Sequence, residues 1–153
     1  MKHIPFLFDF FFVYFNMNRK KIWVNGTFDI LHVGHIRLFK FASDLGNVRV
    51  GLDTDDRIKT LKGDNRPFNS LSRRIEFLSA ISYIDTIVTF NSDIELINRI
   101  KEYQPDIMVI GSDYKNKKII GSEYIPNIVY FDLVNDVSST KILKYYENIN
   151  NRK

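Results

Sequence analysis

The sequence contains no cysteine, which excludes a disulfide framework, a thiolate metal site and a cysteine nucleophile. This absence agrees with a reducing compartment. Histidine is scarce as well, with 3 residues among 153, so chemistry that needs imidazole is confined to few positions. The formal net charge of +4 suits phosphate-bearing ligands, but the chain lacks the dense Lys and Arg face that a nucleic-acid-binding protein needs.

Long apolar runs are also missing. The most apolar stretch lies within residues 1–16, where Asp9 interrupts a run too short for a membrane span of about 20 residues. No small-x-small cleavage site follows, as a secretory signal requires. Met17 precedes a basic stretch and the first predicted strand. We therefore expect that translation naturally starts at Met17, and that residues 17–153 form a single domain.

The rest of the chain alternates between strand and helix patterns. Short apolar runs predict buried strands at residues 22–25, 48–52, 85–90, 106–110 and 127–131. Helical periodicity predicts helices at 34–45, from a cap at Asn69 or Ser70 to Ser82, at 93–103, and from Ser138 onward. The polar segment 54–62 predicts one helical turn and a loop. This alternation predicts the α/β class, as a Rossmann-like parallel five-stranded sheet with helices on both faces.

Three chemically unusual segments follow predicted strands, at residues 26–35, 111–118 and 136–141. In sheets of this kind, ligands bind beyond the carboxyl ends of the strands, where the strand order reverses. We therefore expect the three segments to converge on one site.

The first of these segments contains His32 and His35, three positions apart and beside Gly34. A helix N-terminus with free N–H groups favours anions, so histidines there can face a polyphosphate and stabilise its charge. The spacing alone leaves open that both are ordinary surface or core residues. A zinc pair is a weaker alternative, because there is no cysteine and no third histidine nearby.

The sequence GTFDILHVGH at residues 26–35 resembles the first signature of the cytidylyltransferase-like nucleotidyltransferase superfamily, and VSSTKI at 137–142 resembles the second. A finer match lies within that superfamily. The segments LKGDNRP at 61–67 and GSDYK at 111–115 are similar to segments of the adenylyltransferase domain of bacterial heptose-phosphate kinase/adenylyltransferases. Glycerol-3-phosphate cytidylyltransferases carry an arginine before the second signature, where this chain has LVND at 133–136. Ser112 and Asp136 stand where the heptose enzymes have glycine.

The resemblance implies transfer of a nucleoside monophosphate, with AMP favoured, from a nucleoside triphosphate to a sugar phosphate of the heptose 1-phosphate type, with release of pyrophosphate. It implies catalytic roles for His32, His35 and Lys62. Lys62, expected on a mobile loop, and Arg74 would bind the acceptor phosphate, and Asp85 would be mainly structural. The nucleotide-binding residues that it implies are Gly26, Thr27, Phe28, His32, Gly34, His35, Asp113, Ser138, Ser139 and Thr140.

The same resemblance implies Mg²⁺ that arrives with the triphosphate rather than in a protein cage, a homodimer and a cytoplasmic location. The expected partners are a nucleoside triphosphate and a sugar or polyol phosphate, with no nucleic acid and no membrane. Three alternatives stay open. One is a cytidylyltransferase that uses CTP and glycerol 3-phosphate or another polyol phosphate, and another is a nucleotide-binding module without catalysis. The third and weakest is membrane association through the aromatic N-terminus.

Overall fold

The computed structural model describes residues 19–132 and 138–150, apart from the side chains of Thr140, Glu147 and Asn150. The expected extension at 1–16 and the segment 133–136 lie outside the described residues. The strands are β1 (Lys21–Gly26), β2 (Asn47–Asp53), β3 (Thr86–Phe90), β4 (Ile107–Gly111) and β5 (Asn127–Phe131). The helices are α2 (Val33–Leu45), α3 (Asp55–Lys62), α4 (Leu71–Ser79), α5 (Asp93–Tyr103) and α6 (Ser139–Asn150), with short 3₁₀ turns η1 (Ser112–Tyr114) and η2 (Ser122–Tyr124).

The five strands form one parallel sheet in the order β3-β2-β1-β4-β5, which confirms the predicted fold class. The strand order reverses between β1 and β4. β1 pairs with β2 along its whole length, as far as Gly26 opposite Leu52. It pairs with β4 only at Ile22 and Trp23. The carboxyl ends of β1 and β4 therefore separate, and the separation leaves space for a site at the predicted place.

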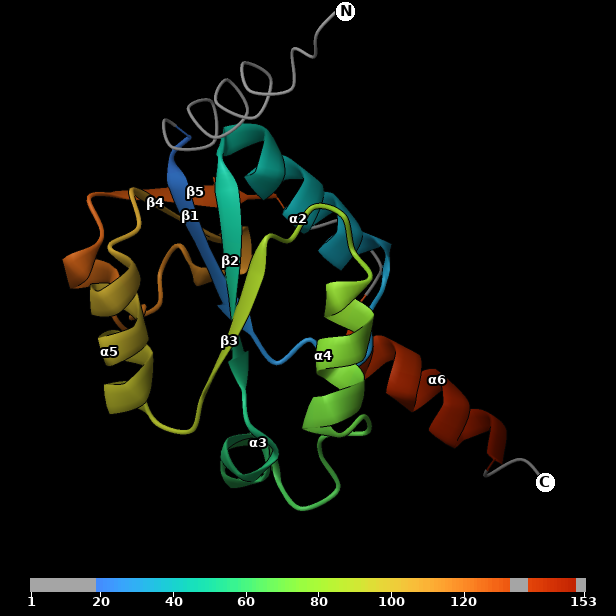
Figure 1. Ribbon diagram of the computed structural model, residues 1–153. Helices are drawn as coiled ribbons and strands as arrows, with labels where there is room; N and C mark the ends of the chain where they lie inside the picture. The colour runs from blue at the N-terminus through green and yellow to red at the C-terminus, as the bar shows by residue number, and fades with distance from the viewer. Residues whose placement is uncertain (1–18, 133–137, 151–153) are drawn as a thin grey trace, which may run out of the picture.

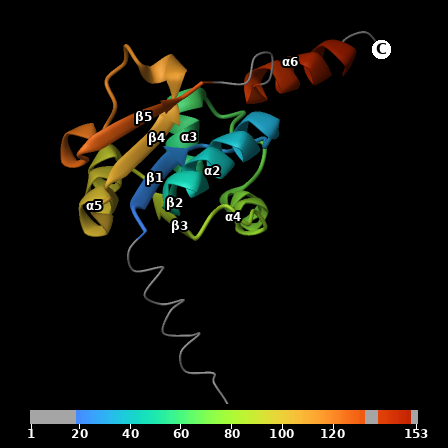
Figure 2. The same cartoon turned by 90° about the horizontal axis from the view of Figure 1, so that it is seen from above.

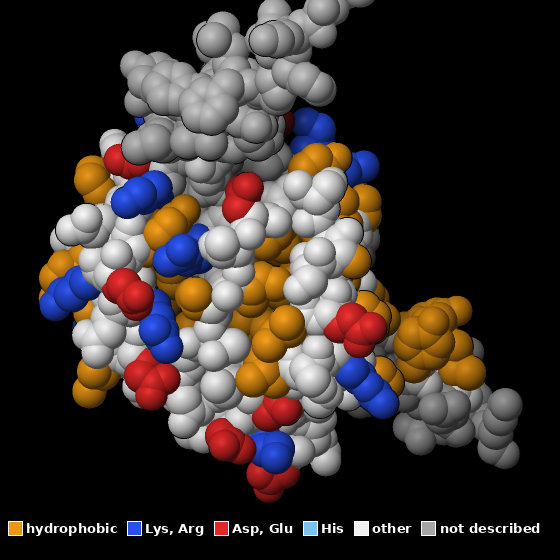
Figure 3. Space-filling model, in the orientation of Figure 1, with side chains coloured by type: hydrophobic (Ala, Val, Ile, Leu, Met, Phe, Trp, Pro, Cys, Tyr) orange, Lys and Arg blue, Asp and Glu red, His pale blue; other side chains and the backbone are white. Residues whose placement is uncertain are grey.

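Helices cover both faces of the sheet (Figures 1 and 2). Because successive strand residues point to opposite faces, β1 contributes to two apolar layers. The layer beneath α2 and α4 contains Ile22, Val24, Phe39, Ala42, Val48, Val50, Leu52, Leu78 and Val109. The layer beneath α5 contains Trp23, Phe90, Leu96, Ile100, Met108 and Ile125. On the face seen in Figure 3, acidic and basic side chains are interspersed rather than gathered into one basic patch.

Two helices differ from the sequence-based expectation. The segment after β2 forms the eight-residue helix α3 rather than one turn and a loop, because Thr54 caps it and its acidic first turn and basic last turn match the helix dipole. α4 ends at Ser79 instead of Ser82, since the chain must turn before it enters β3 at Thr86.

The cap position of α4 is as expected, but the expected capping hydrogen bond is not formed. Ser70 occupies the N-cap position, but its hydroxyl contacts Ser72 and does not cap the helix. The Asn69 side chain donates to the Asp29 carbonyl instead. The N–H of Leu71 at the start of α4 is bound by the Asp55 carboxylate, which comes from α3.

Candidate active site

A cleft of about 530 Å³ opens where β1 and β4 separate. The ends of both strands, the N-terminus of α2, the end of α3 and the start of α6 contribute to its walls. Ten residues singled out from the sequence line it: Gly26, Thr27, Phe28, His32, Gly34, His35, Lys62, Asp113, Ser138 and Ser139. The structure thus brings these residues together, while their ligand roles stay predictions. A more open hollow of about 590 Å³, beside α3 and α4, contains none of the ten.

His32 and His35 form a stacked pair, with ring centroids 3.8 Å apart and an interplanar angle of 24°. Phe28 packs edge-on against His35 at 5.2 Å, from a left-handed backbone with φ of 45°. Burial lowers the pKa of His32, and burial together with the neighbouring His32 lowers the pKa of His35 to about 4. Both rings are therefore neutral at pH 7.

The buried Nδ1 atoms of His32 and His35 have no hydrogen-bond partner within the described part of the chain. The Nε2 atoms are consequently the ring nitrogens that a ligand in the cleft can reach. A neutral imidazole that carries its proton on Nε2 is a hydrogen-bond donor there.

The N-terminus of α2 lacks the side-chain cap that α3 and α5 have. His32 is its N-cap residue, yet no side chain caps the helix and no acidic residue lies in its first turn. In contrast, Thr54 caps α3 and Ser92 caps α5, and both of these helices begin with acidic residues. The positive end of α2 is therefore left to attract an anion in the cleft.

Lys62 is the last residue of α3, and not part of a loop as expected. Its Nζ donates to Thr27 Oγ1 at 2.9 Å, and Thr27 Oγ1 in turn donates to Asp53 Oδ2 at 3.3 Å. Lys62 stands at the rim of the cleft, where partial burial of its ammonium group, and then the charge of Arg66, lower its pKa. This ammonium group is therefore directed at the segment between β1 and α2.

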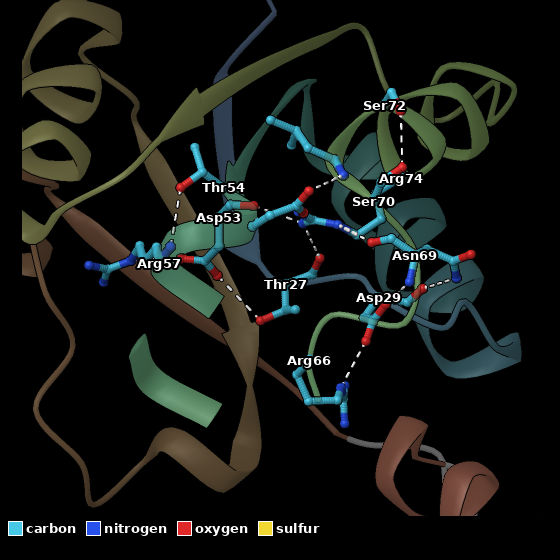
Figure 4. A network of polar contacts seen from close by, with 12 residues as sticks. Thr27, Asp29, Asp53, Thr54, Arg57, Arg66, Asn69, Ser70, Ser72 and Arg74 are labelled. Carbon is cyan, nitrogen blue, oxygen red and sulfur yellow. Dashed lines mark hydrogen bonds and ion pairs between the residues drawn. The ribbon is translucent and has the colours of Figure 1, made fainter. Parts of the chain in front are cut away.

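Asp29 holds the loop that follows α3 (Figure 4). Its carboxylate is 1% exposed and accepts hydrogen bonds from Arg66 Nε at 2.9 Å, Phe68 N at 2.9 Å and Asn69 N at 2.8 Å. Arg66 lines the cleft close to Lys62, and the sequence analysis did not assign it a role. The motif at 61–67 offered a signal for Arg66, but its partner Asp29 lies 37 positions away.

The expectation that Arg74 binds the acceptor phosphate is wrong. Its side chain is fully buried. The guanidinium donates to the carbonyl oxygens of Thr27, Asp53 and Asn69 at 2.9, 2.8 and 3.1 Å, and to Asp55 Oδ1 at 2.7 Å. Arg74 therefore ties the ends of β1 and β2 to α3 and α4, and no substrate can reach it in this arrangement.

The remaining predicted residues have identifiable contacts. Ser139 Oγ donates to the Ile30 carbonyl at 2.8 Å, which attaches α6 to the first motif. Ser138 Oγ accepts from Lys141 N at 3.2 Å and so caps α6. Asp113 lies 3.6 Å from Lys117 at the cleft rim. Asp85 Oδ2 accepts from Val48 N at 2.6 Å, which confirms its structural role. The Thr140 side chain and Asp136 lie outside the described residues.

Within residues 19–132 and 138–150, no three His, Cys, Asp or Glu side chains lie close enough together to hold a metal ion. The carboxylates that line the cleft, Asp29, Asp53 and Asp113, each face a cationic side chain already. None of the helices in the described ranges has the length and apolar character needed to cross a bilayer.

Proteins named "Bifunctional protein HldE" are similar to the chain in sequence. The one from Campylobacter fetus is 44% identical over 123 residues, and the one from Helicobacter hepaticus is 42% identical over 128 residues. These matches cover 80% and 82% of this chain but 27% and 26% of the relatives, so the chain spans about a quarter of their length.

Two solved structures share the fold. A lipopolysaccharide core biosynthesis protein from Thermoplasma volcanium matches with a TM-score of 0.58 and 21% identity, over 75% of this chain and 96% of that one. Pantothenate synthetase from Thermus thermophilus matches with a TM-score of 0.57 and 14% identity, over 85% of this chain and 64% of that one. The model of the cytidylyltransferase-like family matches residues 23–144, which include both walls of the cleft. The chain therefore belongs to the cytidylyltransferase-like family.

Proposed function

We propose that the chain is a nucleotidyltransferase that transfers AMP from ATP to a sugar phosphate of the heptose 1-phosphate type and releases pyrophosphate. The observation that carries this proposal is the convergence of His32, His35, Lys62 and Ser139 on one cleft. The motifs shared with heptose-phosphate adenylyltransferase domains, and the 44% identity to an HldE protein, support the choice of substrates.

The triphosphate occupies the wall formed by α2. The uncapped helix N-terminus attracts its charge, and the neutral rings of His32 and His35 donate Nε2–H to the β- and γ-phosphate oxygens. Ser139, at the start of α6, lies close enough to the first motif to act on the same phosphates.

The acceptor phosphate lies against Lys62 and Arg66. Both side chains line the cleft, and an anion between them would favour the charged form of Lys62, whose pKa is lowered first by burial and then by the charge of Arg66. An oxygen of the acceptor phosphate forms a bond to the α-phosphorus, and the bond from that phosphorus to pyrophosphate breaks with its electron pair. The acceptor is already anionic, so the step needs positioning and charge stabilisation but no general base.

Mg²⁺ arrives with the triphosphate in this proposal, held by phosphate oxygens, and when bound it offsets their charge. The carboxylates of the cleft support this view, because each already faces a cation and together they do not form a cage.

We further propose a homodimer in the cytoplasm, where nucleotides are available. Helix α6 projects from the body of the molecule (Figure 1), and it exposes Tyr145, Tyr146 and Ile149. Exposed apolar side chains of this kind favour association. The mass in solution, measured by light scattering, tests the dimer.

The proposed reaction is tested by screening the four nucleoside triphosphates against a panel of sugar and polyol phosphates for pyrophosphate release. We expect the fastest turnover with ATP and a heptose 1-phosphate. Faster turnover with CTP and glycerol 3-phosphate would instead assign the chain to the polyol-phosphate cytidylyltransferases. Pyrophosphate release from no combination would refute the catalytic role.

A further inference from the structure

Asn25 lies in β1, one residue before its end, and lines the cleft. It shares a sheet face with Trp23, two residues earlier, because alternate residues of a strand point the same way. Trp23 is fully buried in the layer beneath α5. Its indole Nε1 donates a hydrogen bond to Asn25 Oδ1 at 3.0 Å. The Asn25 side chain is thus attached to a rigid part of the core.

Gly51 makes this contact possible. It is the register partner of Asn25 on β2. A Cβ at Gly51 would lie 2.6 Å from Trp23 Cζ2, closer than atoms pack, and 3.2 Å from Asn25 Cβ, which is a tight contact. The missing side chain therefore lets the indole ring lie across β2 and reach the amide of Asn25.

The hydrogen bond also fixes which end of the amide faces the cleft. An indole N–H only donates, so it must meet the oxygen of Asn25, and the amide nitrogen Nδ2 must point elsewhere. No side-chain hydrogen bond among the described residues uses Nδ2, and it is not one of their buried unpaired atoms. The side chains of the layer beneath α5 that line the cleft are apolar, namely Phe90, Leu96, Ile119 and Ile120. Arg57 lies over the Phe90 ring, but its guanidinium is paired with Asp53 and Asp93. A fixed, uncharged donor therefore stands beside apolar side chains.

We propose that Asn25 Nδ2 binds a hydroxyl oxygen of the acceptor sugar, and that Trp23 is the positioning residue that holds the amide in the required orientation. This inference rests on the proposed function. With the triphosphate at α2 and the acceptor phosphate at Lys62 and Arg66, the sugar extends to the wall beneath α5. A neutral donor suits a hydroxyl there, whereas charged groups suit the phosphate.

Steady-state kinetics with ATP and a heptose 1-phosphate test the proposal in the full chain. Asn25→Ala should raise the KM for the sugar phosphate roughly 3- to 10-fold, the effect of one lost hydrogen bond, and leave the KM for ATP unchanged. Asn25→Asp keeps an oxygen towards Trp23 but places an anionic oxygen in the cleft, so the same KM should rise further. Asn98→Asp, at an exposed position on α5, is the matched control and should change neither KM.

The role of Trp23 is tested through Asn25. Trp23→Phe removes the indole N–H and frees the amide to rotate, so it should raise the same KM. The double variant Trp23→Phe/Asn25→Ala should have the same KM for the sugar phosphate as Asn25→Ala, because Trp23 acts only through the amide. Full additivity would overturn the positioning role, and thermal unfolding identifies any variant that is merely unstable.

Failure of this proposal is distinguishable from failure of the proposed function. Suppose that folded Asn25→Ala has wild-type turnover and an unchanged KM for the sugar phosphate, or that its KM for ATP shifts instead. Either result overturns the assignment of Asn25 and leaves the proposed function intact. If the wild type transfers no nucleotide, the Asn25 assignment is tested instead by measuring the binding of heptose 1-phosphate by calorimetry. Binding that weakens in Asn25→Ala, while inorganic phosphate binds both proteins equally, supports the assignment, and equal binding of heptose 1-phosphate or none overturns it.

Discussion

Replacement of Asp29 by asparagine tests the attachment of the loop at 63–69 to the first motif. The carboxylate uses Oδ1 to accept from Asn69 N, and Oδ2 to accept from Phe68 N and Arg66 Nε. An asparagine amide must place its NH₂ group at one of these two positions. In either orientation a donor faces a donor, and the charge that pairs with Arg66 is lost.

The cost follows from the burial of this carboxylate, which is 1% exposed. Charge-assisted hydrogen bonds contribute about 1.5–3 kcal/mol each, and loss of one partner of a buried ion pair costs somewhat more. Because the loop stays close to water, we expect a loss of about 3 kcal/mol. For a domain of this size that corresponds to a fall in Tm of roughly 6–12 °C.

Thermal unfolding followed by circular dichroism measures this effect. Asp44→Asn is the matched control, because Asp44 forms an exposed ion pair with Lys40, and we expect its Tm to equal that of the wild type. In the remaining folded Asp29→Asn protein, the KM for the sugar phosphate should rise more than the KM for ATP, since Arg66 is no longer held. A Tm equal to that of the control would refute the reasoning.

Arg74→Met should lower the free energy of unfolding by about 3–5 kcal/mol in urea titrations, because the buried side chain loses its ion pair with the partly exposed Asp55 and three carbonyl oxygens lose their donor; wild-type stability would contradict the buried role. His35 takes up a proton below pH 6.5 in the unfolded chain but only near pH 4 in the folded one. The contribution of neutral His35 to the free energy of unfolding should therefore be fully present above pH 6.5. It should fall by up to ~3 kcal/mol between pH 6.5 and 4, and a His35→Ala variant should show a flatter profile. His35→Ala should also lower kcat roughly 10²- to 10³-fold, and turnover near that of the wild type by the folded variant would reject its catalytic role. Lys62→Ala should raise the KM of the sugar phosphate and Ser139→Ala that of the triphosphate; equal effects on both substrates would show that the site is divided incorrectly.

The sequence by itself determined the order of the five strands, the type of every helix except α3, and the place of the site. The strands after Lys21, the helix ending before Gly46 and the cap at Ser92 follow from apolar periodicity and from capping residues, which act within one or two turns of the chain. The motif at 26–35 likewise identified the histidine pair, because both residues lie on a single turn at the start of α2.

The tertiary structure alone decided which charged residues face the cleft. Arg66 lies in the loop after α3 and Arg74 lies in α4, and the sequence around each arginine does not show which way its long side chain points. Asp29 directs Arg66 to the cleft wall, whereas Asp55 and three carbonyl oxygens bury Arg74. These partners lie up to 47 positions away, so the direction of each long side chain depends on how the strands and helices assemble. The cleft itself has the same origin, because it exists only where β1 and β4 cease to pair.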